Sequence, residues 1–173
     1  MSTETVPLTT TYTARPIPAA VLVELRTTDD AGRACAPYTA PEGGEPLRCC
    51  LRRAERGERI ALVSYAPLRR WAAETGAEPG AYDEQGPVFV HAAPCGGPQP
   101  SGTYPFAHAG ALRTLRRYDP AGHITGGRLL HLADDTTKPL DEALAEAFEN
   151  PETTLVHVRA VEHGCFLFEI RRP

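Results

Sequence analysis

The chain has 173 residues, of which 42% are hydrophobic and 23% are charged, so its length and composition fit one compact domain. Its 18 basic and 22 acidic residues give a net charge of −4, which excludes the broad positive field that binds polyanions, and we expect no nucleic-acid partner. No apolar run approaches the ~20 residues of a membrane span, and the start of the chain lacks a secretion signal. We therefore expect no membrane partner and a cytoplasmic location.

The beginning of the chain predicts a tail followed by short elements. Residues 1–11 are polar and aperiodic, which is typical of a flexible N-terminal tail, and we assign residues 12–173 to a single α+β domain. Residues 12–17 have the pattern of a short strand, and Pro18 is suited to the first turn of a helix that ends by Asp29. Glycine and proline, with 15 and 17 residues, make up about a fifth of the chain, which favours many turns over long helices.

The middle of the chain predicts strands on either side of a short helix. Residues 48–53 and 59–66 resemble two strands, and Gly57 lies between them where a turn needs a positive φ, so we expect a hairpin. A helix is predicted around residues 71–75, and residues 88–92 have the composition of a buried strand that ends in a loop rich in proline and glycine.

The C-terminal part predicts two hairpins separated by a helix. Residues 111–118 and 123–132 flank a turn with proline second and glycine fourth, the arrangement that a type I turn favours. A helix opens at Pro139 and ends before Pro151. Residues 154–161 and 165–171 form the second predicted hairpin. The whole pattern predicts an α+β single domain with a largely antiparallel β-sheet of about seven or eight strands, built from hairpins, and two or three short helices.

Strand alternation places several polar side chains on the strand faces opposite the apolar residues. His91 points away from Val88 and Val90, and His157 and Arg159 point away from Val156 and Val158. In the last strand the same alternation predicts one apolar row, formed by Phe166, Phe168 and Ile170. If these strands are neighbours, two imidazoles and a guanidinium can converge on a small anionic or carbonyl substrate. The alternative is that both histidines are structural or lie at the surface.

The cysteines support a competing hypothesis. The five cysteines are an odd number without a secretion signal, so we expect reduced thiols rather than disulfides. His91 and Cys95 have an H-x3-C spacing that suits zinc, and the pairs Cys49–Cys50 and His163–Cys165 are further candidate ligands. On a strand, adjacent cysteines point to opposite faces, so we expect at most one of Cys49 and Cys50 in a given site. Buried inert thiols and a nucleophilic Cys50 or Cys95 remain open as alternatives.

Six segments together resemble the bacterial family known as domain of unknown function 1203. They are LRRAERGE at 51–58, IALVSY at 60–65, GPVFVHA at 86–92, LRRYD at 115–119, HVRA at 157–160 and HGCF at 163–166. The resemblance covers residues 46–172 and implies a small cytoplasmic bacterial protein without implying a reaction. The polar positions that match the family are Arg48, His91, Tyr118, Asp119, His157 and Arg159.

The leading hypothesis is a cofactor-independent enzyme that acts on a small polar metabolite by hydrolysis, elimination or cyclisation. His91 and His157 are the expected catalytic acid and base. Arg48, Arg159, Tyr82 and Tyr118 are the expected substrate-binding residues. We assign no metal ligand and no cofactor, and we expect a small-molecule ligand, with a homodimer as an option. The alternatives are a non-catalytic module that binds a small molecule or a protein, and a zinc-binding protein with Cys and His ligands.

Overall fold

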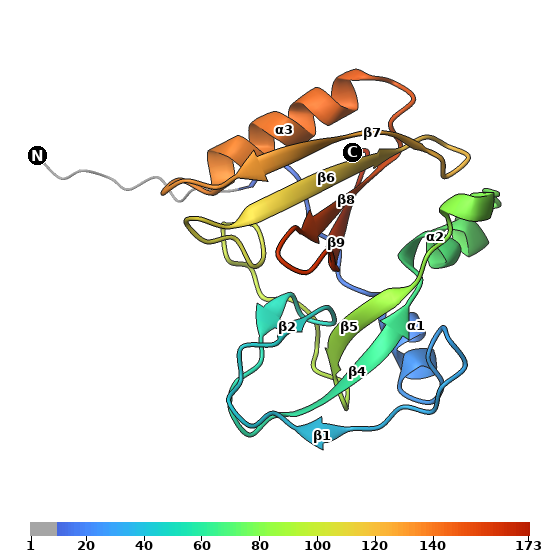
Figure 1. The fold of residues 1–173 in the computed structure, drawn as a ribbon, viewed down its shortest axis with the longest axis vertical. Helices are drawn as coiled ribbons and strands as arrows, with labels where there is room; N and C mark the ends of the chain where they lie inside the picture. Colours follow the sequence, from blue (N-terminus) through green and yellow to red (C-terminus); the bar gives the residue numbers. More distant parts are fainter. Residues whose placement is uncertain (1–9) are drawn as a thin grey trace, which may run out of the picture.

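The computed structural model describes residues 10–173, so the expected flexible tail at residues 1–11 lies outside the described residues except for its last two positions. Within the described part, nine strands form two sheets, and the chain also has three α-helices (Figure 1). The predicted α+β class with largely antiparallel pairing is confirmed. The strands are divided between a five-stranded and a four-stranded sheet rather than joined in one. None of the helices between residues 10 and 173 has the length and hydropathy needed to cross a bilayer.

The first sheet comes from the N-terminal half of the chain and has the order β1-β4-β5-β2-β3. Its strands are β1 (Tyr38–Thr39), β2 (Pro46–Leu47), β3 (Arg52–Arg53), β4 (Arg59–Tyr65) and β5 (Gly86–His91). The antiparallel pair β4–β5 forms its centre, and β2 runs parallel to β5 with Leu47 opposite Phe89. This parallel contact brings the β2–β3 hairpin to the end of β5.

The predicted hairpin between residues 48–53 and 59–66 is wrong. β3 pairs with β2, whereas β4 pairs with β1 and β5. The reason is a tight turn over residues 48–51, in which the Leu51 N–H donates to the carbonyl of Leu47 at 2.9 Å and Leu51 takes a left-handed φ of 56°. The turn reverses the chain before a strand of the predicted length can form.

The second sheet comes from the C-terminal half and has the order β7-β6-β8-β9, with every pair antiparallel. Its strands are β6 (Leu112–Tyr118), β7 (Ile124–His131), β8 (Leu155–Ala160) and β9 (Phe166–Arg171). Both predicted hairpins are confirmed. In the first of them, the Asp119 carboxylate accepts hydrogen bonds from the N–H groups of Ala121 and His123, and Gly122 supplies a φ of 86°. Local turn chemistry therefore determines this pairing.

The helices agree with the predicted positions. They are α1 (Ala19–Leu25), α2 (Pro67–Thr75) and α3 (Thr137–Glu149), with a 3₁₀ turn η1 (Gly80–Tyr82) after α2. Gly76 ends α2 with a φ of 77°. Figure 1 shows α3 across the face of the second sheet that points away from the first sheet. The strand predicted at residues 12–17 is absent, because this segment makes a single bridge, from Arg15 to Glu169.

Strands β8 and β9 of the second sheet are buried on both faces, whereas the edge strand β7 is mostly exposed. Val156 and Val158 pack with Leu144 of α3 on one side. The apolar row predicted for β9 is interrupted by a register shift, since Arg159 pairs with Phe166 while Val158 pairs with Phe168. Phe166 consequently packs in the core of the first sheet, and Phe168 packs in the core beneath α3. The face that carries His157 is therefore covered by the first sheet.

Leu144→Ala tests the packing of α3 on this sheet. Leu144 is fully buried, and we expect the substitution to lower the free energy of unfolding by about 2–5 kcal/mol in a denaturant titration. The matched control is Leu129→Ala in β7, where the side chain is 64% exposed and a change within about 0.5 kcal/mol is expected. Equal effects of the two substitutions would contradict this description of the core.

Candidate metal centre

Three cysteines and one histidine of the first sheet converge at the end of β5. Cys49 and Cys50 lie in the β2–β3 turn, His91 is the last residue of β5, and Cys95 lies in the following loop. The parallel register explains the meeting: Leu47 lies opposite Phe89, so two residues further along each chain Cys49 reaches His91. The His91 N–H donates a hydrogen bond to the Cys49 sulfur at 3.2 Å. We call these four residues the Cys/His cluster.

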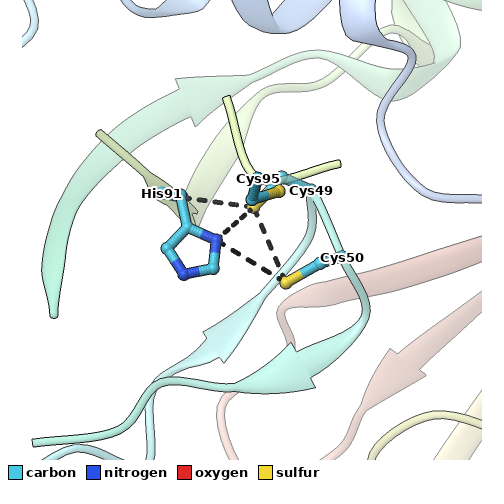
Figure 2. Close-up of side chains that lie close together, drawn as sticks. All are labelled: Cys49, Cys50, His91 and Cys95. Carbon is cyan, nitrogen blue, oxygen red and sulfur yellow. Dashed lines mark hydrogen bonds between the residues drawn. The ribbon is translucent and has the colours of Figure 1, made fainter. Parts of the chain in front are cut away.

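The donor atoms of the Cys/His cluster have the spacing of ligands around one ion (Figure 2). The Nδ1 atom of His91 lies 3.4 Å from the Cys49 Sγ and 3.7 Å from the Cys50 Sγ, and these two sulfurs are 4.0 Å apart. All four donor atoms, including the Cys95 sulfur, lie within 4.8 Å of one another. A tetrahedral zinc ion with Zn–S bonds of about 2.3 Å and a Zn–N bond of about 2.0 Å requires neighbouring donors roughly 3.5–3.8 Å apart.

The second nitrogen of His91 is oriented by a carboxylate. Nε2 lies 3.1 Å from Oε1 of Glu58, which can accept the Nε2 proton. Arg52 holds the same carboxylate through two contacts of 2.9 and 2.6 Å. With the proton on Nε2, the lone pair of Nδ1 is directed at the thiols, which is the tautomer that a metal ligand needs.

The surroundings also favour a thiolate in the Cys/His cluster. The pKa of Cys50 is lowered to about 6, mainly because the Cys49 thiol donates a hydrogen bond to the Cys50 sulfur. The backbone N–H and the positive charge of Arg52 lower it further, whereas burial of the thiol raises it. The pKa of Cys49 is raised, because its proton is used in that hydrogen bond and because the thiol is buried. The contact between the two thiols therefore favours the thiolate form at Cys50 over Cys49.

A cavity of about 590 Å³ opens onto the Cys/His cluster. Cys50, His91 and Cys95 line it together with residues of the segment from Gly97 to Pro105. The cluster is thus close to solvent on one side, and an ion has a route to it that needs no unfolding of the sheet.

The expectation that only one of Cys49 and Cys50 can join a site is wrong. It assumed a strand, where neighbouring side chains alternate, but both residues lie in a turn and both sulfurs reach His91. The H-x3-C spacing predicted that His91 and Cys95 lie in one site, and both belong to the Cys/His cluster. His163 and Cys165 lie in the loop between β8 and β9, outside the cluster.

His157 lies in the second sheet, away from the Cys/His cluster. Its side chain is 1% exposed, and its ring centroid lies 4.7 Å from that of Tyr118 and 5.0 Å from that of Phe166. Within residues 10–173 neither ring nitrogen has a hydrogen-bond partner, and the nearest carboxylate oxygen, on Glu169, is 3.9 Å from Nε2. Burial lowers the pKa of His157 well below its usual value, and the positive charge of Arg159 lowers it further. His157 is therefore neutral in the folded protein.

Two other expected substrate-binding residues have protein partners. Arg159 forms an ion pair of 3.2 Å with Glu84 and donates two hydrogen bonds to the carbonyl of Gly164. Tyr82 is exposed in η1, and its ring lies 5.3 Å from that of His123. These contacts account for both side chains without a ligand.

The six residues expected to form one site are distributed over the molecule. Tyr118 packs on His157, and Arg48 is buried against the carbonyl of Phe166. His91 lines the cavity beside the Cys/His cluster, whereas Arg48 and Arg159 line two other cavities. The acid–base role assigned to His91 and His157 stays a prediction, and the structure places the two rings on different sheets.

The buried state of His157 predicts a pH dependence of stability. Only the unfolded chain can bind a proton at this position as the pH falls through about 6.5, so the free energy of unfolding decreases with falling pH. Between about pH 7.5 and 5.5 we expect this group to remove about 1.4 kcal/mol. Denaturant titrations should show that His157→Phe lacks this part of the decrease.

The control for that experiment is His131→Phe in β7, because His131 is exposed and contacts solvent in both states. It should retain the pH dependence of the unsubstituted protein. If His157→Phe retains it as well, His157 is protonated in the folded protein and the interpretation above is wrong.

Comparison with known proteins gives one match. The model of the family described as "Protein of unknown function (DUF1203)" matches residues 44–172, which confirms the resemblance seen in the sequence. No curated protein and no solved structure matches the chain. The matched region includes every residue of the Cys/His cluster and both sheets except β1. The chain belongs to the DUF1203 family.

Proposed function

We propose that this protein binds one Zn²⁺ ion through the Cys/His cluster, with three sulfur ligands and one imidazole nitrogen. The observation that carries this proposal is the mutual approach of the four donor atoms to within 4.8 Å. The three separations given above, 3.4, 3.7 and 4.0 Å, differ from the edges of a zinc tetrahedron by only a few tenths of an ångström.

The donor set favours zinc over other biological metals. Calcium and magnesium require oxygen ligands, and the Cys/His cluster offers sulfur and nitrogen. An iron–sulfur cluster with two irons distributes its four protein ligands over both metals, which spreads the ligands more widely than one ion does. Four soft donors gathered around one point suit a single tetrahedral ion, and zinc is the metal most often bound in this way.

The charges around the Cys/His cluster suit a zinc–thiolate centre. Three thiolates and one neutral imidazole around Zn²⁺ carry a net charge of −1. The guanidinium of Arg52 lies 3.3 Å from Nε2 of His91, and the His91 backbone N–H points at the Cys49 sulfur. The backbone N–H stabilises negative charge on the Cys49 sulfur, and Arg52 balances the charge of Glu58. Glu58 fixes the ring of His91 in the manner of the carboxylates behind many zinc-bound histidines.

The role supported by this ligand set is structural. Four protein ligands close the coordination shell of zinc, whereas catalytic sites keep one position open. The ion would join the β2–β3 turn, whose two strands have only two residues each, to the end of β5 and to the loop that carries Cys95. Zinc at Nδ1 also excludes proton transfer by that nitrogen, so metal binding and the acid–base role compete for His91.

Metal analysis of the purified protein tests the proposal. We expect about one zinc per chain, and Cys95→Ser should lose most of it, because an alcohol is a far weaker ligand than a thiolate. Zinc removal by a chelator should lower the free energy of unfolding by several kcal/mol, since the binding energy of a structural ion is folding energy.

Cys165→Ser is the matched control, because this cysteine is also partly exposed and lies outside the Cys/His cluster. It should keep the zinc content of the unsubstituted protein. Protein prepared without chelator that contains no zinc, or equal losses in the two variants, would refute the proposal.

Glu58→Ala tests the group behind His91. Loss of the carboxylate removes the acceptor of the Nε2 proton and should weaken zinc binding by roughly 10–100-fold in a competition titration with a chromophoric chelator. Glu55→Ala removes a nearby carboxylate that makes no side-chain contact with His91, and its zinc affinity should stay within about twofold of the original. Weakening of the same size in both variants would show that the number of nearby carboxylates, and not the contact of Glu58 with His91, sets the zinc affinity.

A further inference from the structure

A second cavity lies between the two sheets, on the opposite side of the β2–β3 turn from the Cys/His cluster. It has a volume of about 730 Å³, and its walls come from β3, β4 and β5 of the first sheet and from β6 and β9 of the second. No residue of the Cys/His cluster lines it. We call it the inter-sheet cavity.

Arg48 brings a buried positive charge to the inter-sheet cavity. The residue is 2% exposed, and its guanidinium donates hydrogen bonds to the carbonyls of Phe166, at 2.8 Å, and Pro46. Within residues 10–173 no carboxylate oxygen lies within 4.0 Å of it. Its Nη2 hydrogens have no acceptor in the described residues.

Two more arginines line the same cavity. Arg113 is 4% exposed and is paired with Glu162 at 3.1 Å, and it also donates to the carbonyl of Phe106 at 2.8 Å. The guanidinium carbon of Arg53 lies 5.9 Å from the centre of the Phe106 ring. The acidic residues of the wall are Glu162, which is already paired, and Glu45. Three arginines against two glutamates leave the wall with a positive balance.

Much of the remaining wall is apolar, and the backbone of one of its residues is strained. Leu62, Phe89, Phe106 and Leu167 supply the apolar surface. Phe106 has a left-handed φ of 60°, a conformation that a bulky residue adopts at a cost of about 1–3 kcal/mol. The bond from Arg113 to its carbonyl and the contact of its ring with Arg53 hold it there. A strained aromatic held by two cavity arginines is a feature that folding alone does not require.

We propose that the inter-sheet cavity binds a small organic acid, whose carboxylate pairs with Arg48 and whose apolar part lies against Leu62 and Phe106. A carboxylate would give the buried guanidinium its missing counter-ion and accept its free Nη2 hydrogens. The apolar walls distinguish such an acid from an inorganic anion, which would gain nothing from them. Cavities of this volume, mostly apolar with a few charged groups, are typical of small-molecule sites.

Three probes of matched shape test this proposal on the full chain. Phenylacetate carries both required features, phenylacetamide lacks the charge, and acetate lacks the apolar group. Backbone amide shifts recorded by NMR should saturate with phenylacetate at residues that line the inter-sheet cavity. The affinity for phenylacetate should exceed the affinities for phenylacetamide and acetate by roughly tenfold or more.

A pair of leucine variants ties the binding to the cavity. Arg48→Gln removes the guanidinium that would pair with the carboxylate, but the buried hydrogen bonds of Arg48 to two carbonyls also support the fold. Leu62→Glu avoids this difficulty, because Leu62 is 50% exposed, and it should weaken phenylacetate binding roughly tenfold by placing a negative charge at the rim. Leu129→Glu makes the same change on β7, which contributes no residue to the cavity lining, and should have no effect.

Three results would overturn the proposal. They are the absence of saturable shifts with phenylacetate up to about 10 mM, equal affinity for phenylacetate and phenylacetamide, and equal weakening by Leu62→Glu and Leu129→Glu. None of these results bears on the zinc content, so this proposal and the zinc proposal fail separately.

Discussion

The parallel contact between β2 and β5 is the constraint on which both candidate sites depend. It consists of little more than Leu47 opposite Phe89 and a hydrogen bond of 2.8 Å from the Arg48 N–H to the Phe89 carbonyl. The turn that follows it directs Arg48 toward the second sheet and directs Cys49 and Cys50 toward His91. One four-residue turn thus supplies the central residue of the inter-sheet cavity and half of the Cys/His cluster. A two-residue strand stabilises the β2–β5 contact only weakly. An ion bound by residues of the β2–β3 turn and of β5 would reinforce it.

Local signals explain why some of the fold was predictable. The β6–β7 hairpin depends on the four-residue turn from Asp119 to Gly122, whose chemistry is visible in the sequence. The end of α2 at Gly76 and the opening of α3 near Pro139 are equally local. By contrast, the division into two sheets and the parallel β2–β5 contact depend on pairings between segments about forty residues apart, and no periodicity encodes a partner. The sequence therefore indicated the elements of the C-terminal half better than their assembly with the N-terminal half.

The candidate site, too, could be predicted only in part from the sequence. Alternation correctly placed His91 and His157 opposite the valines of their own strands, but it could not tell what would cover those faces. His91 meets two cysteines from a turn, whereas the ring of His157 is enclosed between Tyr118 and Phe166. Two histidines with the same sequence signature thus have different chemistry, one a potential ligand and the other a buried neutral ring. The adjacent cysteines were misjudged for a related reason, since the strand assumed around them is a turn.

The strained backbone positions within residues 10–173 lie at the two candidate sites. Leu51 and Phe106 are the non-glycine residues there with a left-handed φ, of 56° and 60°. Leu51 ends the turn that presents Cys49 and Cys50, and Phe106 forms the wall of the inter-sheet cavity against Arg53 and Arg113. A bulky residue keeps such a conformation only where its surroundings over-determine it. Both strained residues lie at the two candidate sites, where backbone strain is more common than elsewhere in proteins.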